Sequence, residues 1–92
     1  MPRQVDIGAV LDGLVDRLAA IEHERWSHWQ RYMHSKGIRQ SDGTLVLPAE
    51  FVERWDRQAA TAYSNLSATE RESDREQVKR YLPIIAAALS KP

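Results

Sequence analysis

Charged side chains occupy positions of this sequence where a helical apolar stripe is expected. With successive residues about 100° apart around a helix, Glu22 and Arg25 fall on the apolar side of one predicted helix, and Arg71 and Asp74 on that of another. An unpaired buried charge costs several kcal/mol, so these four residues need one another or a ligand as partners. If the two helices meet, the four form one partly buried charged network.

Such a network has the chemistry to bind a planar, polar, anionic molecule. Guanidinium groups bind phosphate through paired hydrogen bonds, an indole stacks on a base, and carboxylates accept hydrogen bonds from ribose hydroxyls or an exocyclic amine. The predicted ligand-binding residues combine the four charges with neighbouring rings and a further arginine: Glu22, His23, Arg25, Trp26, Tyr63, Arg71, Asp74 and Arg75. A structural salt-bridge cluster that fixes helix register explains the same charges, and the sequence leaves both interpretations open.

The patterns that usually indicate catalysis are missing. His23 and His28 are five positions apart, whereas the zinc-protease motif needs two histidines four apart on one helical face. Five positions turn a helix by about 140°, so the two imidazoles diverge. The sequence also has no glycine-rich phosphate loop and no serine with an evident base. We therefore predict no catalytic residue, no metal site and no cofactor.

Composition limits the partners and the compartment. Thirteen basic residues balance thirteen acidic ones and cysteine is absent, so we expect no direct binding to DNA or RNA and no disulfide, which fits a cytoplasmic location. The longest apolar run, residues 82–89, is shorter than the ~20 residues of a membrane span, and Asp6 with Asp12 disfavours a signal peptide. We therefore expect a protein that stays in the cytoplasm without contacting a membrane.

Apolar spacing predicts an all-α fold, a three-helix bundle formed by one domain over residues 1–92, with frayed ends at 1–6 and 90–92. The long first helix begins at Ile7, after Asp6 as N-cap, and ends at Gly37. An irregular loop or small hairpin follows at about 37–47, because Asp42-Gly43 favours a tight turn between short apolar stretches.

Two more helices complete the predicted bundle. The second begins at Pro48, which suits a first helical turn, and ends near Asn65. The third begins at the capping box formed by Ser67 and Glu70 and continues to Leu89. Pro83 lies inside it and should kink it by removing one hydrogen bond. A chain of this length has a small core, so a homo-oligomer also fits.

Two sequence blocks resemble the RyR domain, a small helical module named after repeats in the ryanodine receptor, in its prokaryotic and phage form. Residues 18–26 contain Glu22-His23-x-x-Trp26, similar to the family's Glu-His-x-x-Trp helix. Residues 66–78, followed by Leu82-Pro83, are similar to its Leu-Ser helix start, Asp-Arg pair and Leu-Pro pattern.

The resemblance covers most of residues 18–86 and includes Leu45-Val46-Leu47-Pro48. Family members usually pass quickly from that turn to the Leu-Ser helix start, whereas residues 49–65 insert a whole helix here. The matching positions are Glu22, His23, Trp26, Asp74 and Arg75. The resemblance implies a ligand-binding module, since bacterial members are thought to sense nucleotide-derived signals in anti-phage defence.

The leading functional expectation is a binding protein for a nucleotide-derived small molecule, such as a cyclic nucleotide or an ADP-ribose-type immune signal. As a free-standing domain it would act as a sensor subunit or as a phage anti-defence sponge. Two alternatives remain. One is a protein-interaction or oligomerisation module with a structural charge cluster. The other is a metal-assisted nucleotide hydrolase that uses Glu22, His23 and Asp74.

Overall fold

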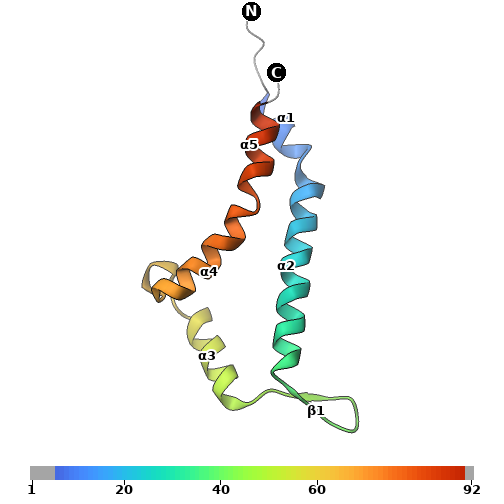
Figure 1. Cartoon of the computed structure of the whole chain (residues 1–92), viewed down its shortest axis with the longest axis vertical. Coiled ribbons are helices and arrows are strands. Elements are labelled where there is room, and N and C mark those ends of the chain that lie inside the picture. Colours follow the sequence, from blue (N-terminus) through green and yellow to red (C-terminus); the bar gives the residue numbers. More distant parts are fainter. Residues whose placement is uncertain (1–5, 91–92) are drawn as a thin grey trace, which may run out of the picture.

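The computed structural model describes residues 6–90 and shows two helical arms joined by a small hairpin (Figure 1). The outgoing arm is formed by α1 (Ile7–Asp12) and α2 (Val15–Ser35), and the hairpin by β1 (Ile38–Arg39) and β2 (Leu45–Val46). The returning arm is formed by α3 (Ala49–Ala59), a 3₁₀ turn η1 (Tyr63–Asn65), α4 (Ala68–Lys79) and α5 (Leu82–Ser90). The predicted all-α class, with a long early helix and a hairpin near residues 37–47, is confirmed.

The outgoing arm begins at the predicted cap but is not one continuous helix. The Asp6 carboxylate accepts a hydrogen bond from the Ala9 backbone amide at 3.1 Å, as expected of an N-cap. The helix predicted from Ile7 to Gly37 is interrupted after Asp12, because Gly13 has low helix propensity and becomes the C-cap of α1. Leu14 lies in this break and is 4% exposed.

The hairpin follows from local turn chemistry. Ile38 pairs with Val46 and Arg39 with Leu45 in an antiparallel register. The Asp42 carboxylate accepts from the Thr44 amide at 3.0 Å and from its hydroxyl at 2.7 Å. Gly43 has a φ of +89°, which a residue with a Cβ rarely adopts. These short-range bonds explain why the Asp-Gly pair predicted the turn.

The returning arm is divided more often than predicted. α3 begins directly after Pro48 and ends at Ala59, before the predicted end near Asn65. The capping box is confirmed: the Ser67 hydroxyl accepts from the Glu70 amide at 3.2 Å, and the Glu70 carboxylate from the Ser67 amide at 3.1 Å. The single helix predicted to continue to Leu89 is wrong, because the chain breaks between α4 and α5. Pro83 is the second residue of α5, where its missing amide hydrogen leaves no helical hydrogen bond unmade.

The two arms touch mainly near their ends (Figure 1). α1 and α5 lie side by side at the end of the arms away from the hairpin. Toward the hairpin, the Trp29 ring of α2 meets the Trp55 ring of α3 edge-on, with centroids 5.2 Å apart. The Arg54 guanidinium also donates to the Tyr32 hydroxyl at 3.3 Å. Trp29 is packed on one side and about two-fifths exposed.

The chain is much less compact than its length allows. Its radius of gyration is 19.0 Å, against about 12 Å for a compact domain of this length. It exposes 7491 Å², where a compact protein of its mass exposes about 5,500 Å². Leu14 is the only buried apolar side chain in residues 6–90. The arms therefore form an open bundle with apolar surface in contact with solvent.

The described helices begin and end close to the ends of the chain. Most of the predicted frayed ends, residues 1–5 and 91–92, lie outside the described residues, whereas Asp6 caps α1 and Ser90 is the last residue of α5. None of the helices within residues 6–90 combines the length and hydropathy that a membrane span requires.

Replacing Gly37 with alanine should destabilise the hairpin end of the molecule. A Cβ at Gly37 would lie 2.5 Å from Leu45 Cγ, so the side chain of β2 would have to move, at a cost of about 1–3 kcal/mol. We expect Gly37→Ala to lower the free energy of unfolding, measured by circular dichroism in urea. Gly8→Ala is the control, because its new Cβ meets only Asp6 Oδ1 at 3.4 Å. The clash explanation fails if Leu45→Ala does not relieve the effect in the double variant.

Candidate ligand-binding cleft

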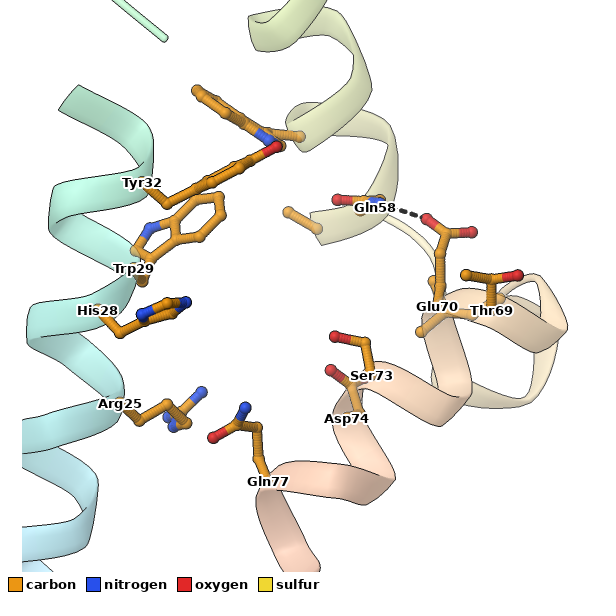
Figure 2. A pocket seen from close by; sticks show the side chains of 13 residues that line it. Arg25, His28, Trp29, Tyr32, Gln58, Thr69, Glu70, Ser73, Asp74 and Gln77 are labelled. Atoms are coloured by element: carbon orange, nitrogen blue, oxygen red, sulfur yellow. Dashed lines mark hydrogen bonds between the residues drawn. The ribbon is translucent and has the colours of Figure 1, made fainter. Parts of the chain in front are cut away.

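A cleft of about 710 Å³ lies between the two arms, opposite the middle of α2 (Figure 2). One wall comes from α2 and the other from α3 and α4, so the site joins segments far apart in the sequence. The lining residues are Arg25, His28, Trp29, Tyr32, Trp55, Gln58, Ala59, Leu66, Thr69, Glu70, Ser73, Asp74 and Gln77. The cleft combines aromatic rings, amides, two carboxylates and one guanidinium.

Helical periodicity explains the α2 wall. Arg25, His28, Trp29 and Tyr32 are spaced at i, i+3, i+4 and i+7, which places them on one face of the helix. Figure 2 shows all four side chains directed from α2 toward the opposite arm. One helical face thus supplies a cation, an imidazole and two large rings.

The facing wall is also built on helical spacing. Ser73, Asp74 and Gln77 follow Glu70 along α4 and project toward α2 (Figure 2). Gln58 of α3 donates a hydrogen bond to the Glu70 carboxylate, which links α3 to α4 across the η1 turn. Hydrogen bonds from Ser67 and then Gln58 hold the pKa of Glu70 below its usual range. Glu70 is therefore an ionised structural anchor of this wall.

Only two of the predicted ligand-binding residues reach this cleft. Arg25 extends from α2 and Asp74 from α4, on opposite walls (Figure 2). The remaining six predicted residues do not line it: Glu22, His23, Trp26, Tyr63, Arg71 and Arg75. Tyr63, Asp74 and Arg75 line a separate, smaller hollow of about 510 Å³ on α4 and α5. Asp74 is common to both hollows.

The predicted buried network of Glu22, Arg25, Arg71 and Asp74 does not form. Glu22 and Arg25 make an ion pair along α2, and both side chains are about half exposed. Arg71 donates to the Ser64 backbone carbonyl at 3.3 Å. The prediction assumed that the apolar side of each helix is buried, but the arms stand apart and the charges remain hydrated. Arg25 and Arg71 therefore each bond a partner on their own arm instead of an acid on the other arm.

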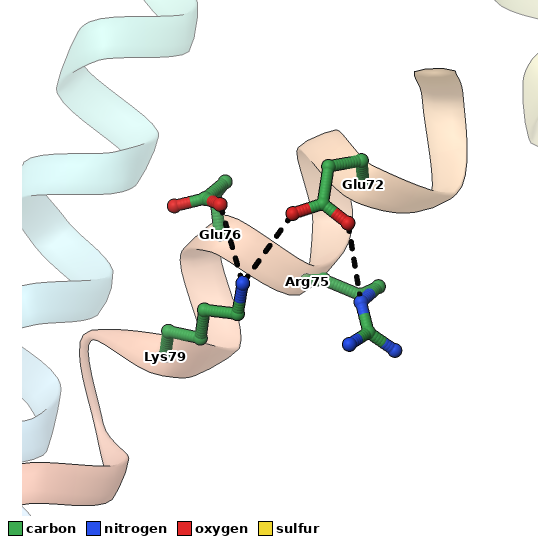
Figure 3. Close-up of polar contacts among 4 residues, drawn as sticks. All are labelled: Glu72, Arg75, Glu76 and Lys79. Carbon is green, nitrogen blue, oxygen red and sulfur yellow. Dashed lines mark hydrogen bonds and ion pairs between the residues drawn. The ribbon is translucent and has the colours of Figure 1, made fainter. Parts of the chain in front are cut away.

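The remaining predicted residues lie on exposed helical surface. The rings of His23 and Trp26 stack with centroids 6.0 Å apart, and His23 Nε2 lies 3.4 Å from the Ser27 hydroxyl. Arg75 Nε pairs with Glu72 at 3.2 Å, beside the pairs that Lys79 makes with Glu72 and Glu76 at 3.4 Å (Figure 3). These are solvated pairs along α4, and exposed pairs of this kind contribute little stability.

The sequence interpretation missed most of the cleft. His28, Trp29 and Trp55 line it but were not among the predicted ligand-binding residues. The spacing from Arg25 to Tyr32 already contained the signal for the α2 wall. Nothing in the sequence pattern indicated that Gln58, Ser73 and Gln77 would face that wall, since this depends on the break between α3 and α4.

On the side of the cleft away from the hairpin, two polar contacts connect the arms. The Tyr81 hydroxyl donates to Glu22, and Arg80 pairs with Glu24. Hydrogen bonds from Arg25 and then Tyr81 lower the pKa of Glu22. The same bond to Glu22 raises the pKa of Tyr81. The Glu22–Tyr81 contact is therefore strongest while Glu22 is ionised and Tyr81 is protonated.

Neither a search for metal-binding clusters nor a comparison with known proteins assigns a function to the cleft. Across residues 6–90, no group of three or more histidine, aspartate or glutamate side chains is arranged to hold a metal ion. No protein-family model, curated protein or solved structure matches the chain. The resemblance to RyR domains therefore stays a prediction based on the two short sequence blocks.

Neutralising Glu22 should lower the pKa of Tyr81. The Tyr81 pKa is raised in the folded chain, so this bond stabilises the fold below the ordinary tyrosine pKa and is lost as pH rises through the folded value. We expect Glu22→Gln to shift the Tyr81 titration toward lower pH, followed by tyrosinate absorbance in a Tyr32→Phe/Tyr63→Phe background.

The matched control is Glu24→Gln, which removes a carboxylate from the same helix that bonds Arg80 and not Tyr81. It should leave the Tyr81 titration unchanged. Equal shifts in both variants would assign the raised pKa to general negative charge on α2 and contradict a specific contact.

Proposed function

We propose that the chain is a binding protein for a nucleotide-derived small molecule and that the cleft between α2 and α4 is its site. The observation that carries this proposal is the gathering of Arg25, Trp29 and Asp74 around one cleft from opposite arms. Its volume of about 710 Å³ lies within the range of about 300–1,000 Å³ typical of ligand pockets.

The lining chemistry matches the parts of a nucleotide. Trp29 and Tyr32 offer ring surfaces on which a base can stack. The amides of Gln58 and Gln77 present both donors and acceptors, which suits the polar edge of a base. Asp74 can accept hydrogen bonds from ribose hydroxyls, and the Arg25 guanidinium can bind phosphate.

The charge of the cleft narrows the ligand class. Arg25 is the one guanidinium that lines the cleft, which is also lined by the carboxylates of Glu70 and Asp74. A ligand with several phosphates would meet more negative than positive charge there. The cleft therefore favours a ligand with a single phosphate charge, such as a cyclic mononucleotide, over a pyrophosphate or a cyclic oligonucleotide.

The proposed biological role follows the RyR resemblance. A protein that binds such a signal without converting it acts as a sensor subunit or as a sponge that removes the signal from an immune pathway. The hydrolase alternative gains no support from the site. Glu22 is bonded to both Arg25 and Tyr81, and His23 faces Ser27 and Trp26 rather than Asp74.

A second candidate function is a helical interaction module. The specific observation that favours it is the exposure of large apolar side chains on α1, α5 and the hairpin, which a monomer of this length rarely leaves in water. The two functions are compatible, because the cleft and the most apolar helix, α5, lie on different parts of the chain.

A thermal-shift screen tests the ligand proposal. Cyclic mononucleotides, cyclic dinucleotides, ADP-ribose and NAD are each added to the purified chain, and the ligand is then recovered and analysed. A ligand at 100 times its dissociation constant stabilises by about 2.7 kcal/mol. We expect a shift with a cyclic mononucleotide that is recovered intact. A flat response across the panel contradicts the proposal, and a converted product would favour a hydrolase.

Two matched arginine variants locate the site. Arg25→Gln should weaken binding at least tenfold, because Arg25 is the only guanidinium lining the cleft. Arg71→Gln removes the same charge from α4, outside the cleft, and should leave the affinity unchanged. Isothermal titration measures both, with helicity checked by circular dichroism. The cleft is the wrong site if Arg71→Gln weakens binding as much as Arg25→Gln.

A further inference from the structure

The residues of α5 are almost all apolar, yet the helix lies exposed to solvent. Leu82–Ser90 contains no charged side chain and consists almost entirely of aliphatic residues. A helix that is apolar on all sides is normally buried, yet none of the residues of α5 is buried, and Leu82 is 54% exposed. A surface that should be covered is therefore open in the isolated chain.

The neighbouring helix extends this apolar surface. α1 lies beside α5 (Figure 1) and exposes Ile7 and Leu11, while Val15, at the start of α2, is 59% exposed. We call the exposed residues Ile7, Leu11, Val15, Leu82 and Leu89 the terminal apolar patch. We propose that a second copy of this chain covers the terminal apolar patch in a symmetric dimer.

The exposed area fits the requirement of a stable dimer. The chain exposes 7491 Å², about 2,000 Å² more than a compact protein of its mass. If two copies each bury half of that excess at the patch, their interface totals ~2,000 Å², the size at which obligate homodimer interfaces begin. Half of the excess surface of the open chain is thus enough for one self-association.

The charge pattern favours a second copy over another partner. α5 carries no charge and α1 only that of Asp12. In a two-fold contact the same patch meets itself, so a charged patch would bring like charges together, whereas an uncharged patch does not. The patch also offers no charge that would select a partner of opposite sign. A second copy can therefore cover this surface without needing charges that complement those of the patch.

Sedimentation equilibrium of the full chain tests the proposal. We expect a mass twice the chain mass of 10.6 kDa at micromolar concentration, with no larger species. Val15→Lys and Leu89→Lys each place a charge in the patch and should raise the dimer dissociation constant at least tenfold. Both side chains are already partly exposed in the isolated chain, so the substitutions leave the fold of each protomer intact.

The matched control is Val46→Lys, which adds the same charge at a residue of β2 that is 50% exposed and far from the patch. It should leave the dissociation constant unchanged. A chain that sediments as a monomer at all concentrations overturns the proposal, as does equal weakening by Val46→Lys. Open-ended association, or binding to lipid vesicles that Leu89→Lys abolishes in a monomeric chain, would also overturn it.

Hydrogen exchange provides a second measurement that does not depend on the variants. If a second copy covers α5, its amides should exchange more slowly at a protein concentration above the dissociation constant than below it, while those of α3 remain unchanged. Uniform slowing along the whole chain would indicate general stabilisation and contradict a contact at the patch.

Discussion

The aromatic contact between α2 and α3 is the interaction on which the rest of the structure depends. Trp29 meets Trp55 edge-on with ring centroids 5.2 Å apart, and the rings of Tyr32 and Phe51 also contact Trp55. Each such pair adds about 0.5–1.5 kcal/mol beyond the area it buries. In residues 6–90 it is the main apolar attachment between the arms at the hairpin end, and it holds the two walls of the cleft at their separation.

At the other end, both arms bend where their helices break. The Leu14 backbone amide donates to the Leu11 carbonyl at 3.0 Å, and the Tyr81 backbone amide donates to the Val78 carbonyl at 3.0 Å. Both are i to i+3 bonds that tighten the chain where α-helical bonding stops. The first break buries Leu14. The second places Tyr81 against Glu22, so the polar link between the arms depends on the break before α5.

Local hydrogen bonding made much of the fold predictable from the sequence, whereas the separation between the two arms could not be predicted. Asp6 as N-cap, the Asp42-Gly43 turn and the capping box at Ser67 depend on hydrogen bonds within a few residues. Arg25 and Asp74 were predicted because helical periodicity places them on inner faces. The burial of their network was wrong, because periodicity shows which side of a helix is apolar but not whether another helix covers that side.

The cleft and the terminal apolar patch are physically linked through α4. Asp74 belongs to the cleft wall on α4, and the chain passes from α4 through the break at residues 80–81 into α5. The Tyr81–Glu22 contact joins this break to α2, so in the proposed dimer a partner seated on α5 would act next to the link between the arms. Glu22 in turn bonds Arg25, the one guanidinium of the cleft. If the proposed association orders this pivot and the proposed ligand engages Arg25, reciprocal linkage makes any effect of one on the free energy of the other equal in both directions.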